Sequence, residues 1–558
     1  MTEVKKTLRD SALARWTALF IVAFTMFGAY FFNYVLSPIK PLLESALGWT
    51  SSDFGLYTGS YSLFNVFLFM LIISGIILDK WGVRRTGLLA ISLMALGTFI
   101  NYIAIITPFP EGAKLFGIKE QVAIAALGFG VFGVGTEAAG ITVTKAIVRW
   151  FKNKEMALAM GLQMSIARMG TALALAISLP LAKKFTVSAP ILLALIFMLI
   201  GLLAFLLFIY MDKKLDKSEA EANVVSDDEE FHLRDIVDII TNRAFWYIAI
   251  LCVLFYSAVF PFLFYATDLM INKYHVAPKL AGLIPALLPF GTIFLTPLFG
   301  GIYDKKGKGA TIMIIGAVML IFVHGMLAVP GIKVWWFAAA MVIILGIAFS
   351  LVPAAMWPSV PKIIPQNRLG TAYAVIFWIQ NIGLMVVPIL LGWALDKANP
   401  DVSPNKNLIK SSIEYVYKQE LKNIPVLTQK DINVIIEKAS SKVVDSIVQY
   451  ANYGEVANTN QNLDKVKQEI IASVKNAFEQ SNIKQLTDKK AIINAAIDIA
   501  AAHTYDIVLK EKINVRYNYF VVEMIFTILG ILSLLFAILL KAEDKRKGYG
   551  LEQPNIQE

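Results

Sequence analysis

Long runs of apolar residues recur along the whole chain. A helix that crosses a bilayer needs about twenty such residues. Polar turns separate the runs, and none shows the alternation of apolar and polar positions that is typical of a transmembrane barrel. The pattern predicts an all-α membrane protein with twelve transmembrane helices, at residues 14–37, 53–78, 86–107, 121–148, 156–180, 188–211, 244–271, 279–302, 309–330, 334–360, 370–395 and 517–541.

The composition agrees with this pattern. Hydrophobic residues make up 57% of the 558 positions and charged residues only 16%, whereas a soluble domain carries about 25% charge. The one cysteine, Cys252, rules out an intrachain disulfide, and the four histidines show no ligand spacing. We therefore expect no metal site and no cofactor. Of the histidines, only His324 falls inside a predicted span, and we expect it to pack between helices.

The net charge of +10 is unevenly distributed. Most Lys and Arg residues outside a long insertion after the eleventh span fall on one side of the predicted membrane, the side that also holds both termini. This bias marks the cytoplasmic side. It predicts cytoplasmic termini and a chain whose main partner is the lipid bilayer, and it argues against a nucleic-acid-binding protein.

The spans divide six and six around a charged segment, and an internal repeat supports this division. GIILDKWGVRRTG (75–87) follows the second span, and GGIYDKKGKGATI (300–312) follows the eighth. Two six-helix halves are typical of transporters that bind their substrate between the halves. We predict an N-terminal half (1–211), a cytoplasmic linker (212–243), helices 7–11 (244–396), an extracytoplasmic insertion (397–515), and helix 12 with a cytoplasmic tail (516–558).

The two repeated segments resemble the loop motif of the major facilitator superfamily, G-x-x-x-D-[RK]-x-G-[RK]-[RK]. In that family, the acid and its basic neighbours latch the two halves together on the cytoplasmic side. A carboxylate can cap a helix while cations pair across the gap. The resemblance implies a gating role for the matching residues, which are Gly75, Asp79, Lys80, Gly82, Arg84 and Arg85 in the first copy and Gly301, Asp304, Lys305, Gly307 and Lys308 in the degenerate second copy.

The insertion at 397–515 is polar but not linker-like. Three of its segments, residues 409–424, 431–451 and 463–480, carry apolar residues at three- and four-residue spacing, which predicts amphipathic helices. We expect a small helical domain outside the membrane. The sequence leaves open whether it covers the entrance, binds a protein partner or is simply tolerated there.

Four ionisable residues lie well inside the spans: Glu137, Arg168, Asp268 and Glu523. Asp268 and Glu523 fall nearer the extracytoplasmic ends, where we expect water to reach them. Glu137 and Arg168 lie on adjacent helices, each about 20–25 Å from the connecting turn, so we expect them at matching depths near the bilayer centre.

The residue types leave two interpretations of Glu137 and Arg168. They form a salt bridge that neutralises both charges, or they bind the ammonium and the carboxylate of a zwitterionic substrate. A bridge that opens to admit such a substrate combines the two, because the charges of the ligand then replace the lost partners.

A closer resemblance covers residues 15–396 and the last span. FGVFGVGTEAAG (129–140) and VRWFKNKEMALAMGLQMSIARMGTAL (148–173) resemble the lysosomal dipeptide uniporter branch of the superfamily. The resemblance implies that Glu137 binds the amino terminus of a dipeptide and Arg168 its carboxylate. Further positions that match and that could line the binding site are Tyr30, Gln163, Tyr256, Trp357, Gln380 and Asn381.

Two departures from that branch bear on function. The animal members carry Tyr-Asp-Asn-Pro in the first helix, whereas this chain has Tyr34-Val35-Leu36-Ser37 and lacks the acid. Asp268 is a candidate to supply the missing charge or to act as a proton site. The chain also contains no Asn-x-Ser/Thr sequon, which favours a bacterial plasma membrane over a glycosylated lysosomal one.

The sequence therefore predicts a transporter that moves dipeptides by alternating access, and no enzyme. One alternative is a carrier of another small organic anion or amino acid, coupled to protons through Glu137 or Asp268. A second alternative is a membrane receptor that senses its substrate without net transport.

Overall fold

The computed structural model describes residues 7–110, 112–152, 154–221, 239–365, 368–399, 438, 460–480, 503–504 and 518–555. Within these residues, eleven helices are long and apolar enough to cross a membrane. One of them, α5 (Met70–Ile106), contains the end of the second predicted span and all but the last residue of the third. The fold is therefore consistent with the twelve predicted spans, and the all-α membrane architecture is confirmed.

The remaining long helices follow the predicted spans closely. In the N-terminal part of the chain, which we call the first group, these are α1 (Ala12–Tyr34), α6 (Glu120–Trp150), α7 (Met156–Lys184) and α8 (Ala189–Glu221). In the C-terminal part, which we call the second group, these are α10 (Arg243–Asn272), α12 (Leu283–Lys306) preceded by the one-turn α11 (Pro278–Ala281), α13 (Gly309–Ala328), α14 (Trp335–Ile363), α15 (Leu369–Ala398) and α20 (Phe520–Lys547). Small additions are a 3-10 turn, Leu8–Asp10, before α1 and an antiparallel hairpin of β1 (Lys114–Leu115) and β2 (Ile118–Lys119) before α6.

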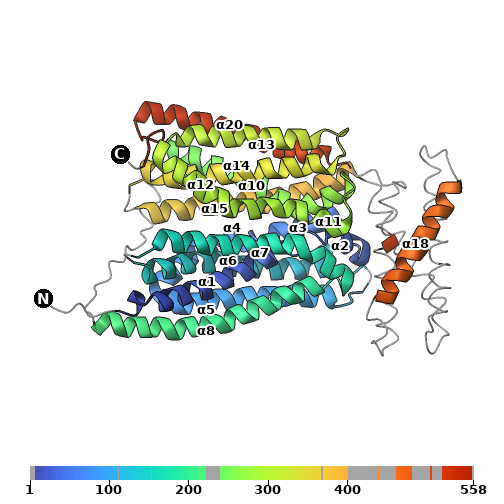
Figure 1. Ribbon diagram of the computed structural model, residues 1–558, viewed down its shortest axis with the longest axis horizontal. Helices are drawn as coiled ribbons and strands as arrows, with labels where there is room; N and C mark the ends of the chain where they lie inside the picture. Colours follow the sequence, from blue (N-terminus) through green and yellow to red (C-terminus); the bar gives the residue numbers. More distant parts are fainter. Residues whose placement is uncertain are drawn as a thin grey trace.

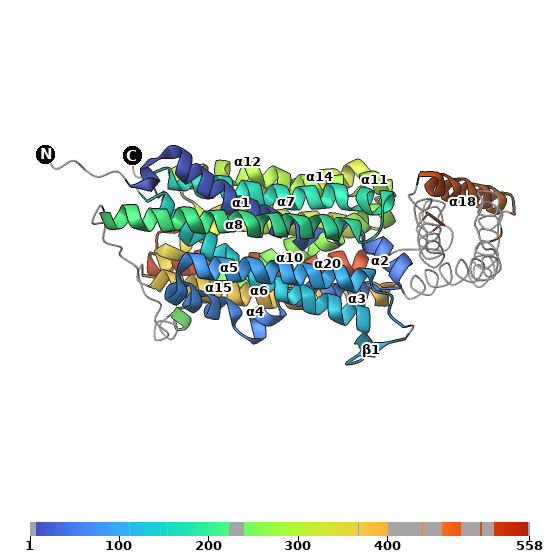
Figure 2. The ribbon, with the colours of Figure 1, turned by 90° about the horizontal axis from the view of Figure 1, so that it is seen from below.

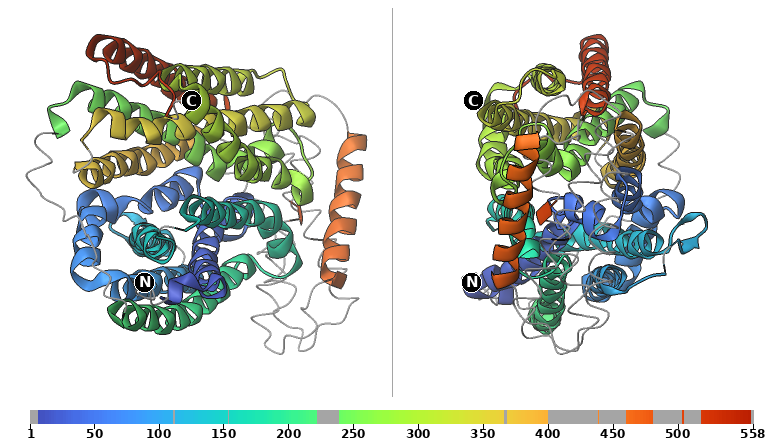
Figure 3. Two further views of the ribbon diagram at one scale, coloured as in Figure 1. Left: turned by 60° about the vertical axis from the view of Figure 1, so that its left-hand side comes forward. Right: turned by 90° about the vertical axis from the view of Figure 1, so that its right-hand side faces the viewer.

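The helices form two adjacent groups with both termini at one end (Figure 1; Figure 3, left). We call this end the terminal side and the opposite end the α18 side, after α18 (Asn460–Gln480), which lies beyond the bundle (Figures 1 and 2). The helix α18 confirms the amphipathic helix predicted at 463–480. Most of the rest of the insertion, including 409–424, lies outside the described residues, as does 222–238 of the predicted linker.

The second predicted span is interrupted. It consists of α3 (Ser51–Ser60), α4 (Leu63–Phe67) and the first part of α5. A turn at Tyr61 and Ser62 separates α3 from α4. The break before α5 is at Phe69, whose φ of 52° is a left-handed conformation that the interior of an α-helix does not contain. Trp378 of α15 stabilises it, because its indole stacks on the Phe69 ring at 5.3 Å and its Nε1 donates to the Val66 carbonyl at 3.1 Å. The break is thus held by a residue of the other group.

The internal repeat is visible in the backbone. Gly82 has φ 73° and ψ 173° within α5, and Gly307 has φ 66° at the end of α12. Both conformations are costly for residues with a Cβ atom. The glycine of each motif copy therefore makes the turn between two membrane helices, in the N-terminal group and again in the C-terminal group.

The two groups are joined most firmly towards the α18 side. There, the Asp396 carboxylate accepts hydrogen bonds from the backbone N–H groups of Ser51 (3.0 Å) and Ser52 (2.7 Å) at the start of α3. A carboxylate satisfies the free donors at a helix N-terminus. In this way α15 of the second group caps a helix of the first group.

Close helix packing next to the interrupted span depends on Gly133 of α6. A Cβ atom at this position would lie 2.0 Å from the Tyr61 carbonyl oxygen, which is backbone and cannot rotate away. A Cβ atom at Gly140, on the same helix, would meet no neighbouring element within 4 Å. Gly133 therefore sets how closely the interrupted span approaches α6.

We predict that Gly133→Ala destabilises the protein by about 1–3 kcal/mol through overpacking, visible as a lower unfolding temperature in detergent. Gly140→Ala is the matched control and is expected to be neutral or slightly stabilising, since Ala is the better helix former. Equal unfolding temperatures for the two variants would contradict the packing argument.

Candidate functional site

Glu137 lies on α6 and is held by residues of both helix groups. Tyr61 directly follows α3, and its hydroxyl donates to Glu137 Oε1 at 3.0 Å. The side chain of Asn381, on α15 of the second group, lies within hydrogen-bonding range of the same carboxylate. Glu137 is half-buried as a whole residue.

Arg168 of α7 lies among aromatic rings. Its guanidinium carbon is 5.8 Å from the centre of the Tyr30 ring, 5.6 Å from that of Phe260 and 5.1 Å from that of Phe349. Each such contact contributes about 0.5–2 kcal/mol, depending on how far the cation is desolvated. Aromatic faces attract a cation without neutralising its charge, so the guanidinium stays available for an anion.

Glu137 and Arg168 do not form a salt bridge. Neither residue has an ion-pair partner within the part of the chain that the structure describes. Tyr30, half-buried on α1, lies within electrostatic range of both charges. The structure thus presents an anion and a cation that do not pair with each other, and the salt-bridge interpretation is not realised in this conformation.

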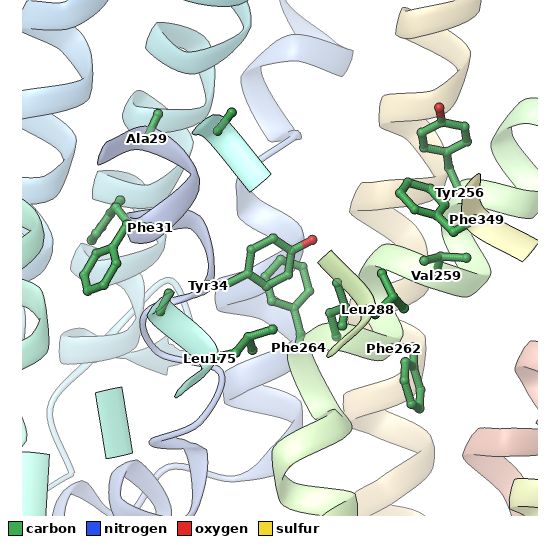
Figure 4. Packing of buried hydrophobic residues seen from close by; sticks show 14 of the residues in the cluster. Ala29, Phe31, Tyr34, Leu175, Tyr256, Val259, Phe262, Phe264, Leu288 and Phe349 are labelled. Atoms are coloured by element: carbon green, nitrogen blue, oxygen red, sulfur yellow. The ribbon is translucent and has the colours of Figure 1, made fainter. Parts of the chain in front are cut away.

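The wall near Arg168 is aromatic. Tyr256 of α10 accepts a hydrogen bond from Trp357 Nε1 at 2.9 Å, and its ring meets that of Phe349 edge-on at 5.5 Å (Figure 4). Nearby, Tyr34 of α1 stacks on Phe264 of α10 at 4.9 Å (Figure 4). Tyr256 thus lies beside Phe349, one of the rings that surround Arg168, and Trp357 is bonded to Tyr256.

The two predicted glutamines differ in environment. Gln163 on α7 is half-buried and has no hydrogen bond among the described residues. Gln380 on α15 is buried, and its Oε1 faces the Cys252 thiol of α10 at 3.6 Å. Gln380 thus lies between two helices of the same group, the position of a polar packing residue.

We expected water to reach Asp268, and this prediction is wrong. It is fully buried on α10 and pairs at 2.8 Å with Lys40, at the start of α2 (Lys40–Leu47) in the first group. Lys40 also pairs with Glu44 at 2.8 Å. Asn272 Nδ2 donates to Asp268 at 2.8 Å, and the Tyr519 hydroxyl donates as well. The acid is shielded because an ammonium from the other group covers it.

Glu523 is also buried rather than exposed to water. Its carboxylate lies 2.8 Å from Nδ1 of His324, and the two side chains are 1% and 0% exposed. The pair joins α13 to α20, with the His324 ring 4.7 Å from that of Phe526. His324 does pack between helices, as expected, but with an acid as its partner.

The loop motifs do not join the two groups in this conformation. Asp79 pairs with Lys145 of α6 at 3.0 Å, and Arg84 pairs with Asp216 of α8, both within the first group. Asp304 accepts from Asn555 Nδ2 at 2.8 Å within the second group. Lys80, Arg85 and Lys305 have no ion-pair partner within the described residues. The expected latch across the groups is therefore not formed here.

Other ion pairs of the terminal side show the same separation. Arg149 of α6 pairs with Asp212 of α8 at 3.1 Å. Lys154 pairs with Asp10 at 2.9 Å. This hydrogen bond, together with a smaller effect of one from the Thr7 backbone, lowers the pKa of Asp10 to about 2. The described ion pairs of this side thus strengthen each group separately.

Four residues that contact the charged residues of the spans could not be identified from the sequence. Tyr61, Phe260 and Phe349 are uncharged residues in apolar spans and gave no signal. Lys40 falls in a short loop outside the predicted spans, where a lysine is normally exposed to solvent. A useful signal was the acid in the seventh span, because a buried carboxylate requires a partner.

We predict that Lys40 and Asp268 are energetically coupled. Removing one member of a buried pair costs about 3–5 kcal/mol, so Lys40→Met and Asp268→Asn should each lower the unfolding temperature markedly. The double variant should lose clearly less stability than the sum of the losses in the two single variants. Strictly additive losses in this double-mutant cycle would show that the two groups do not interact.

Comparisons with known proteins identify the family of this chain. The family model described as Major Facilitator Superfamily matches residues 22–388. The lysosomal dipeptide transporter MFSD1 of Mus musculus is 28% identical over 393 residues, which cover 68% of this chain and 80% of that protein. Its counterpart in Danio rerio is 29% identical over 401 residues, covering 69% and 81%.

Solved structures share the fold. A bacterial homologue of the human lysosomal transporter Spinster, in an inward-facing and unoccupied conformation, aligns with a TM-score of 0.53 at 12% identity, covering 94% of this chain and 99% of that one. The nucleoside transporter NupG aligns with a TM-score of 0.54 at 13% identity, covering 69% and 91%. Since the family model covers more than half of the chain, this protein belongs to the major facilitator superfamily of membrane transporters.

Proposed function

We propose that this transporter carries dipeptides, with Glu137 binding the substrate ammonium and Arg168 its carboxylate. The observation that carries the proposal is that the two opposite charges are both within electrostatic range of one tyrosine, Tyr30, yet unpaired with each other. The relatives named as lysosomal dipeptide transporters support the same substrate class.

The charges argue for a zwitterion. An uncompensated charge inside a membrane protein is costly, and a ligand that carries both signs compensates two such charges at once. A sugar offers neither charge, and a phosphate calls for several cations. A dipeptide spans about 6–10 Å between its termini, so it can reach an anion and a cation that do not touch.

The contacts between the groups support alternating access. In this conformation, polar contacts such as Lys40–Asp268 and Asp396–Ser51 join the groups towards the α18 side. The terminal-side ion pairs instead lie within one group. We infer that the α18 side is closed here, and that the loop motifs pair across the groups when the terminal side closes.

We place the terminal side in the cytoplasm and the protein in a plasma membrane. The bias of Lys and Arg towards that side supports the orientation, and the absence of Asn-x-Ser/Thr sequons supports a compartment without glycosylation.

The proposal predicts that dipeptides stabilise the purified protein. A ligand at 100 times its Kd adds about 2.7 kcal/mol to the stability of the folded state. We expect dialanine or lysyl-alanine to raise the unfolding temperature, and N-acetylated and C-amidated forms to raise it much less. Glu137→Gln and Arg168→Ala should each weaken binding by about 1.5–3 kcal/mol, the value of a hydrogen bond to a charged group.

The chain offers matched controls for these variants. Glu120→Gln makes the same change at the start of α6, and Lys184→Ala removes a cation at the end of α7; both should bind like the wild type. Stabilisation by single amino acids or organic acids, without any response to dipeptides, would contradict the dipeptide proposal.

A proton-coupled carrier is the second candidate, favoured by the buried pair of Asp268 and Lys40. If opening of the α18 side separates them, the freed carboxylate is a place where a proton can bind. In liposomes, Asp268→Asn should then remove the dependence of uptake on a proton gradient. Uptake by Asp268→Asn that equals wild type in rate, proton dependence and selectivity would exclude this role.

A further inference from the structure

Asn65 of α4 is a buried amide without a partner. Its side chain is 0% exposed, and neither its Nδ2 nor its Oδ1 has a hydrogen bond within the described part of the chain. A buried polar group without a partner destabilises the folded state. Such a residue calls for an explanation outside the unliganded fold.

The packing of the interrupted span on α6 brings Asn65 to the level of Glu137. The two segments pack in register, because Gly130 lies against Ser60 and Phe64, and Gly133 lies against Tyr61. One helical turn further along both segments are Asn65 and Glu137. Tyr61 and Asn65 are four residues apart and so share one side of the segment.

The packing of the same segment on α15 points to the same place. Trp378 donates to the carbonyl of Val66, the neighbour of Asn65. Asn381 follows Trp378 by three residues and faces Glu137. The Oδ1 of Asn381 is buried and also has no hydrogen-bond partner among the described residues. The packing on α6 and on α15 therefore brings two amide oxygens without hydrogen-bond partners to the level of one carboxylate.

We propose that Asn65 and Asn381 complete the ammonium site of Glu137. A primary ammonium has three N–H donors, and the site offers one acceptor for each: the Glu137 carboxylate, Asn381 Oδ1 and Asn65 Oδ1. This inference rests on the proposed function and refines it. The site selects substrates with an unmodified amino terminus, since each methyl group on the nitrogen removes one donor and leaves an acceptor vacant.

The test compares dialanine with its N-methyl and N,N-dimethyl forms on the purified protein by calorimetry. All three keep a positive charge, so Glu137 attracts each of them. For the wild type, each methyl group should weaken binding by about tenfold, the loss of roughly one hydrogen bond to a charged group. In Asn65→Leu, binding of dialanine should fall about tenfold, and the first methyl group should cost little more.

Asn65→Leu should also raise the unfolding temperature of the unliganded protein, because it removes a buried polar group that lacks a partner. Asn101→Leu on α5 is the matched control. Its amide donates to the carbonyls of Gly97 and Ala125 at 3.2 Å each, so this change should lower the unfolding temperature and leave the preference for the primary ammonium intact. If Asn65→Leu does not fold, Asn65→Ser tests the same preference.

Several outcomes overturn the inference. Wild-type discrimination that persists in Asn65→Leu or Asn65→Ser shows that Asn65 does not bind the ammonium. Stabilisation by sodium chloride over choline chloride, together with no effect of N-methylation, assigns the vacant oxygens to a metal cation instead. In both cases, loss of dialanine binding in Glu137→Gln would leave the proposed function standing, whereas no dialanine binding by the wild type removes both.

Discussion

The structure depends on one constraint: a charge buried in a membrane protein must be compensated. Asp268 satisfies it with Lys40 at 2.8 Å, and Glu523 with His324 at the same distance. Glu137 and Arg168 are the exception. Hydroxyl and amide donors hold the carboxylate, and aromatic rings surround the guanidinium, but no opposite charge from the described residues completes either of them. On the proposed function, the compensated pairs hold the helices together, and Glu137 and Arg168 bind the ligand.

The same constraint links the site to the movement of the two helix groups. Glu137 belongs to the first group, yet it is contacted by Asn381 of the second, and Arg168 of the first group lies against Phe260 and Phe349 of the second. A ligand bound between the two charges therefore contacts both groups. The interrupted span reinforces this link, because its break is held by Trp378 of α15. We therefore expect substrate binding and the relative position of the groups to be coupled through these residues.

The sequence predicted most of the fold, and it singled out Glu137 and Arg168, on which the proposed site rests. Hydropathy located the helices because a bilayer imposes a minimum apolar length, and the repeated motif located Gly82 and Gly307, which share a positive φ. Equal spacing from one turn is the reason that we expect Glu137 and Arg168 at one depth. The burial of Lys40 could not be predicted, since its partner is more than two hundred positions away. Nor could the break at Phe69, because a tertiary contact from α15 stabilises it against the helical preference of an apolar run.

The central claim is that one ligand connects two charges that do not pair with each other. The most direct measurement is an experimental structure of the protein with dialanine bound in lipid nanodiscs. The account predicts density between α6 and α7, with the ligand nitrogen at Glu137 and its carboxylate at Arg168. A direct Glu137–Arg168 ion pair in the liganded protein, or a ligand bound away from both residues, would contradict it.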